Sequence, residues 1–156
     1  MFPIRTQFRD KILLMKTSII LTILMLSLSS FGATVNLRFT QTADKSGKIF
    51  VAVFDDARAF PKDHTNVFLK KLVPVTSSQT ETSTTIDLPP GNYAIAIFLD
   101  ENGNEKLDTN MLGIPKERFG FSNNRRIITG PPSFGEAEIE VKDGQNNFII
   151  NLIKLF

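Results

Sequence analysis

Alternating apolar side chains are the feature of this sequence that most restricts its fold. In residues 48–55, KIFVAVFD, both faces of an extended strand carry apolar side chains. Residues 93–100, YAIAIFLD, show the same pattern. Every second residue from Tyr93 to Leu99 lies on one face, and the small Ala94 and Ala96 lie on the other. Both segments are therefore predicted to be central strands, and the alanines would let a second layer approach one face closely.

Five further segments have the composition of strands, and turn signals such as PPGN and DGQN separate several of them. They are residues 35–40, 69–75, 82–88, 136–141 and 148–156. Together with the two central strands they predict an all-β fold, an antiparallel β-sandwich of about seven strands. The sequence has no sustained helical periodicity, and at most a short helix is expected within residues 57–71.

Residues 100–135 interrupt this succession of strands and turns, because no clear strand is predicted there. Loops of this length are uncommon in compact domains and are often functional. Apolar side chains recur through the segment, at Leu112, Ile114, Phe119 and Phe121. We therefore expect one long ordered loop that packs down onto the sandwich.

Residues 17–31, TSIILTILMLSLSSF, form an uncharged apolar run between Lys16 and the small residues Gly32 and Ala33. A basic start, an apolar centre and a small-residue end are typical of a secretory signal peptide. The run is shorter than the ~20 residues that a membrane-spanning helix needs. We therefore expect a signal peptide that is cleaved after Gly32 or Ala33.

The predicted signal peptide comprises residues 1–32, of which residues 1–14 are expected to be a mispredicted start or an extended N-terminal region. Residues 33–156 are then a single secreted or periplasmic domain with no membrane span. Removing the four basic residues and one acidic residue of the leader from the chain's 18 Lys and Arg and 16 Asp and Glu leaves 14 basic and 15 acidic groups. This near-neutral balance gives no indication of nucleic-acid binding.

Residues 100–110, DENGNEKLDTN, place oxygen-bearing side chains at alternate positions, as calcium loops of the EF-hand type do. The expected ligands are the side chains of Asp100, Asn102, Asn104 and Asp108 and the carbonyl of Lys106. Glu105 occupies the sixth position, which is normally Gly, and Met111 occupies the twelfth, which is normally Glu. A weak calcium site and a turn held by its own hydrogen bonds both fit the motif, and the two departures favour the turn. No other cofactor is expected.

The block LPPGNYAIAIFLDENGNEKLDTNMLGIPKERFGFSNN, followed by GPPSFGEAEIEV, resembles the DUF2141 family of secreted bacterial proteins. The resemblance covers nearly all of residues 33–156. It implies an exported β-sandwich in the style of transthyretin and other prealbumin-like domains, and it implies no established substrate or catalytic residues. Leu99 stands where family members usually carry His, and Glu105 stands where they usually carry Gly.

Residues 116–126, KERFGFSNNRR, mix basic, aromatic and amide side chains. In an exported protein this composition indicates a solvated loop with an apolar anchor rather than an RNA-binding surface. We expect the loop to bind a partner, either an envelope or extracellular protein or a glycan, and the sequence indicates no oligomeric state. The residues expected to contribute are Lys116, Arg118, Phe119, Phe121, Asn123 and Asn124.

Motifs for catalysis are absent from the sequence. It has no cysteine, no nucleophile elbow and no phosphate-binding Gly-rich loop, and His64 is its one histidine. Asp55 and Asp56 are neighbours that would point to opposite faces of a strand, so they form no obvious catalytic pair. We therefore predict a non-enzymatic binding module. The alternatives are a small hydrolase that uses carboxylates and a purely structural domain with a weak calcium-binding loop.

Overall fold

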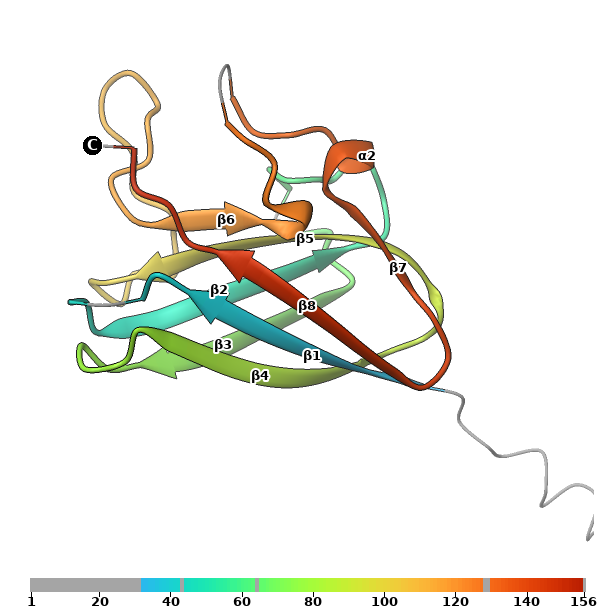
Figure 1. Ribbon diagram of the computed structural model, residues 1–156. Coiled ribbons are helices and arrows are strands. Elements are labelled where there is room, and N and C mark those ends of the chain that lie inside the picture. The colour runs from blue at the N-terminus through green and yellow to red at the C-terminus, as the bar shows by residue number, and fades with distance from the viewer. Residues whose placement is uncertain (1–31, 43, 64, 128–129, 156) are drawn as a thin grey trace, which may run out of the picture. The chain divides into compact units, whose positions relative to one another are not determined.

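Eight β-strands and two short helical turns make up the part of the chain that the computed structural model describes, residues 32–42, 44–63, 65–127 and 130–155 (Figure 1). The strands are β1 (Ala33–Thr40), β2 (Gly47–Phe54), β3 (Leu69–Val75), β4 (Glu81–Leu88), β5 (Gly91–Asp100), β6 (Phe119–Phe121), β7 (Glu138–Val141) and β8 (Gln145–Asn151). The 3-10 turn η1 (Ser122–Asn124) follows β6, and the one-turn helix α2 (Phe134–Ala137) precedes β7. The apolar run at residues 17–31 lies outside the described residues, so export stays a prediction.

The first sheet has three strands in the order β4-β1-β8. β1 pairs with β4 in antiparallel orientation, with Ala33 opposite Leu88. It pairs with β8 in parallel orientation, with Leu37 opposite Phe148. The prediction of a wholly antiparallel arrangement is therefore wrong at this pair, because the first and last strands run in the same direction. Such a parallel pair needs a long connection, and here the whole intervening chain provides it.

The second sheet has the order β3-β2-β5-β6, and all its pairs are antiparallel. β7 also pairs with β5, on the same edge as β6 but at residues 91–94 instead of 96–98. Ile95 falls in the gap between these two partners. Ser122 fills the gap: its Oγ accepts the Ile95 N–H at 2.9 Å and donates to the Ala137 carbonyl. A buried side chain thus replaces the missing hydrogen bond of the ladder.

The two sheets face each other across the main core (Figure 1). Strands β1 to β5, β7 and β8 all contribute buried apolar side chains to it. The predicted faces of β2 and β5 are confirmed. The side chains that they turn toward this core are Ile49, Val51, Val53, Tyr93, Ile95, Ile97 and Leu99.

A second apolar cluster, here called the outer cluster, covers the opposite face of the five-stranded sheet. Its buried members are Phe50, Ala52, Phe54, Ala59, Phe60, Ala94, Ala96, Phe98, Phe119, Phe121 and Ala137. Phe60, from the segment after β2, places its ring 5.3 Å from that of Phe54, 5.8 Å from that of Phe121 and 6.0 Å from that of Phe134. The β2–β3 connection, the long loop and α2 thereby form the second layer that the alanines of β5 indicate.

Further details differ from the sequence-based expectations. The last strand is Gln145–Asn151 instead of residues 148–156. The described chain has eight strands instead of about seven, because the three-residue β6 lies within residues 100–135, where no strand is predicted. The described part of residues 57–71 consists of turns and the start of β3, so the expected helix is wrong. The predicted strand at 136–141 begins only at Glu138, because Ala137 ends α2 and packs in the outer cluster.

Candidate binding pocket

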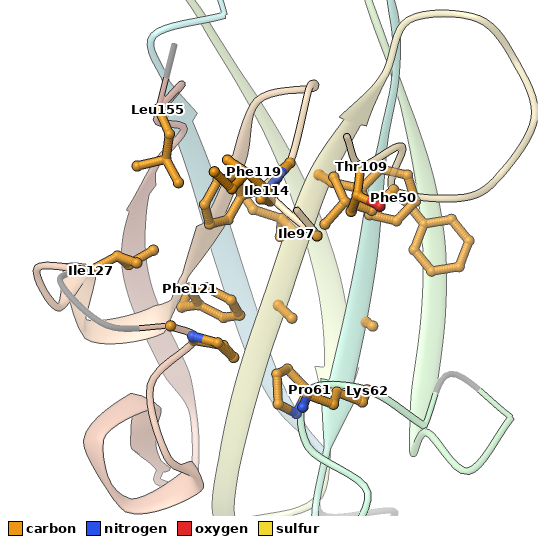
Figure 2. A pocket seen from close by; sticks show the side chains of 18 of the residues that line it. Phe50, Pro61, Lys62, Ile97, Thr109, Ile114, Phe119, Phe121, Ile127 and Leu155 are labelled. Carbon is orange, nitrogen blue, oxygen red and sulfur yellow. The ribbon is translucent and has the colours of Figure 1, made fainter. Parts of the chain in front are cut away.

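A cavity of about 760 Å³ opens on the outer face of the five-stranded sheet, beneath the long loop (Figure 2). Ala52 and Ala96, which are opposite each other in the β2–β5 pair, lie at its floor. An Ala side chain rises only one carbon above the sheet, whereas Phe50 and Phe98 beside them carry full rings, so the surface is hollow at this point. The volume lies within the range of pockets that hold small-molecule ligands.

The lining of the pocket is almost wholly apolar. Its described residues are Phe50, Ala52, Pro61, Lys62, Ala96, Ile97, Phe98, Leu107, Thr109, Leu112, Gly113, Ile114, Pro115, Phe119, Phe121, Ile127, Gly130, Pro131 and Leu155. Lys62 is the one charged residue among them, and Thr109 supplies the one hydroxyl. Figure 2 places Pro61 and Lys62 at one end of the cavity and Thr109 and Ile114 at the other.

A tight hairpin at residues 109–115 forms one wall. Asn110 fixes its shape, because its Oδ1 accepts the N–H groups of Leu112 at 2.9 Å and Ile114 at 3.0 Å. Met111 and Leu112 stand at the exposed tip, and Leu112 also reaches the cavity. The hairpin therefore presents apolar side chains on a backbone that its own hydrogen bonds hold in place.

Asp100 organises the segment that leads to this hairpin, residues 100–108, here called the acidic turn. Its side chain is only 2% exposed, and it accepts three backbone N–H groups, from Gly103 at 2.7 Å, Asn104 at 3.2 Å and Glu105 at 2.8 Å. Burial acts to raise the pKa of Asp100, but the three N–H groups that it accepts, together with the nearby N–H of Asn102, outweigh this effect, so the pKa lies below its usual value. Glu105 adopts a positive φ of 58°, a conformation that Gly takes more easily.

The other three side chains predicted to bind calcium also bond within the turn. Asn102 and Asn104 donate their side-chain N–H groups to Asp108, at 2.7 and 3.1 Å. Their side-chain oxygens accept the N–H groups of Asn104 and Lys106, at 3.0 and 2.8 Å. Within the described residues, no group of three or more His, Asp or Glu side chains is placed to hold a metal ion. The turn is thus held by its own hydrogen bonds, and calcium binding stays a prediction.

Glu117 ties the two ends of the acidic turn together, a role that the sequence did not suggest. The side chain is 5% exposed, and its two oxygens accept the N–H groups of Glu101 and Asp108, each at 3.1 Å. Burial raises the pKa of Glu117, these two N–H groups lower it in part, and the nearby carboxylates of Asp108 and Asp100 raise it further.

The predicted binding-loop residues divide into three pairs. Phe119 and Phe121 are buried in β6 and line the pocket. Asn123 and Asn124 instead hold backbone together: Asn123 donates to the carbonyls of Glu136 and Glu138, and Asn124 bonds both Ile149 and Asn151. The last two predicted residues, which do not line the cavity, are the exposed Lys116 and the half-buried Arg118, whose guanidinium donates to the Gln41 carbonyl at 3.2 Å.

The other residues considered from the sequence lie elsewhere. His64 lies outside the described residues. Asp56 forms an ion pair with Arg58, with Nη2 and Oδ2 2.7 Å apart, and this partner lowers the pKa of the Asp56 carboxyl. It is therefore part of a surface turn rather than of the pocket.

Residues 37–149 match the model of a family described as uncharacterized proteins conserved in bacteria, DUF2141. The chain belongs to this family. The matched region of this DUF2141 chain includes β2 to β7 and the whole long loop, and therefore most of the pocket. The comparisons with curated proteins and with solved structures give no match. Among the described residues, no helix has the length and apolar character to cross a membrane.

Proposed function

We propose that this domain is an exported, non-enzymatic binding module that holds an apolar group of its partner in the pocket beneath the long loop. The observation that carries the proposal is the cavity of about 760 Å³ with its alanine floor and apolar walls. Covering such a surface is favourable, since burial of apolar area contributes about 25 cal/mol per Å². An apolar lining suits lipid-like groups or protein side chains better than the hydroxyl-rich surface of a glycan.

The distribution of carboxylates supports binding rather than hydrolysis. A carboxylate hydrolase needs a pair of such groups facing its substrate. Asp100 and Glu117 are the buried carboxylates of the described chain, but backbone N–H groups occupy their oxygens and neither residue lines the pocket. We assign the acidic turn the structural role of positioning the hairpin, with weak calcium binding as the alternative.

The start of the first strand favours one of the two predicted cleavage sites. β1 begins at Ala33, which is fully buried and pairs with Leu88. Cleavage after Gly32 would leave this strand complete, whereas cleavage after Ala33 would remove a core residue. We also infer that the two sheets form a sandwich of the transthyretin or prealbumin style, which the shared core between them supports.

The proposal predicts that filling the pocket abolishes binding. A neutral apolar dye, N-phenyl-1-naphthylamine, should bind the protein saturably with a rise in fluorescence. In Ala96→Phe a ring would occupy the floor, and the Kd should rise about tenfold or more, because excluding a group the size of one side chain removes about 1.5–3 kcal/mol. Fluorescence titration measures this directly.

Ser83→Phe is the matched control, since it adds the same ring to the exposed face of β4, and its Kd should equal that of the parent. Leu112→Asp places a charge at the exposed rim without touching the core, and it should also weaken binding. Equal affinity in the parent and both pocket variants would contradict the proposal, as would the absence of saturable binding to the parent.

A further inference from the structure

Lys62 is an unusual member of the pocket lining, because it is the one charged residue among the described residues there. It lies at the end of the cavity opposite the hairpin (Figure 2). Across the described chain, no carboxylate oxygen lies within 4.0 Å of its ammonium group. The carboxylate of the adjacent Asp63 accepts the N–H and hydroxyl of Thr65. An apolar cavity therefore has an exposed lysine, Lys62, at one end, and no anion of the described chain is paired with this residue.

We infer that the pocket takes a linear amphiphile that consists of an alkyl chain with a carboxylate at one end, as in a free fatty acid. The alkyl chain lies over the floor formed by Ala52 and Ala96, and the carboxylate meets Lys62. This inference rests on the proposed function and names the class of ligand.

The charges near the floor set the sign of the end group. Lys70 is opposite Ala52 in the β2–β3 pair, so it lies on the same outer face one strand away and adds positive potential. A cationic end group would be repelled by both lysines. A hydroxyl-rich ligand would find few partners, because Thr109 is the one hydroxyl among the described lining residues. A compact carboxylate suits the ammonium group of lysine, which offers three donors.

Calorimetric titration of the purified domain with dodecanoate, dodecan-1-ol and dodecylammonium, each kept as monomers, tests this inference. The carboxylate should bind about two- to fivefold more tightly than the alcohol, the size expected for a solvent-exposed ion pair, and more tightly still than the amine. The preference should shrink at high salt. Shorter carboxylates should bind more weakly, by about fourfold for each buried methylene removed.

Lys62→Gln should bring the carboxylate down to the affinity of the alcohol while leaving the alcohol unchanged. Lys142→Gln, which removes a charge at the β7–β8 turn, should keep the full preference. The inference is overturned if the parent does not favour the carboxylate or if Lys62→Gln retains the preference. If dodecan-1-ol still binds when the inference fails, the proposed function stands and only the assignment of a carboxylate ligand is lost. If none of the three amphiphiles binds, the result counts against the inference and the proposed function alike.

Discussion

Ile95→Ala is expected to lower the free energy of unfolding by roughly 2–5 kcal/mol, the usual loss for a large-to-small change in a core. Ile95 is fully buried, and it belongs to the main core between the two sheets. The truncated side chain would leave a cavity that neighbouring strands cannot fill, because both sheets are fixed by their hydrogen-bond ladders. Urea denaturation followed by circular dichroism measures the change.

Ile149→Ala is the matched control, because the same side chain in β8 is 43% exposed. Its truncation should cost well under half as much, since much of its surface is already in water. Equal losses in the two variants would mean that the main core does not lie between the two sheets as described.

Asp100→Ala is expected to have the second-largest effect, a loss of roughly 1–3 kcal/mol. The change removes the acceptor of three backbone N–H groups, those of Gly103, Asn104 and Glu105. Asp108→Ala should cost less, because its side-chain partners are the exposed amides of Asn102 and Asn104, which water can satisfy. Denaturation with excess chelator gives both values.

Repeating these measurements in millimolar calcium separates the structural turn from a calcium site. As a structural turn, the parent gains no stability from calcium, and the loss in Asp100→Ala is the same with and without it. A site with a Kd of about 10⁻⁴ M would instead stabilise the parent by roughly 1.4 kcal/mol at millimolar calcium. A gain of that size which vanishes in both Asp variants would contradict the structural role assigned to the turn.

The strands were predictable where apolar side chains alternate within a single segment of the sequence. The alternation in β2 and β5 correctly separates the faces that became the main core and the outer cluster. The parallel β1–β8 pair was not predictable, because pairing of distant strands leaves no periodicity in either segment. β6 was not predicted, because its three residues, FGF, are too few to show an alternating pattern.

The candidate site was predictable only in part. The small Ala94 and Ala96 indicate a face that a second layer approaches, but not that a cavity stays open above Ala96. Phe119 and Phe121 were identified as apolar anchors, and they line that cavity. The roles of Ser122 and Glu117 have no signal in the sequence, because they depend on a gap between two strands and on two N–H groups that only the folded chain brings to them.

Amide chemical-shift mapping with dodecan-1-ol tests most directly the claim that this domain binds apolar groups beneath its long loop. The largest shifts in a ¹H–¹⁵N spectrum should fall on the amides of lining residues, namely Ala52, Ala96, Thr109, Leu112, Gly113, Ile114 and Phe121. They should saturate with ligand concentration and leave β1, β4 and β8 unchanged. Saturable shifts confined to the three-stranded sheet, or no shifts at all, would contradict it.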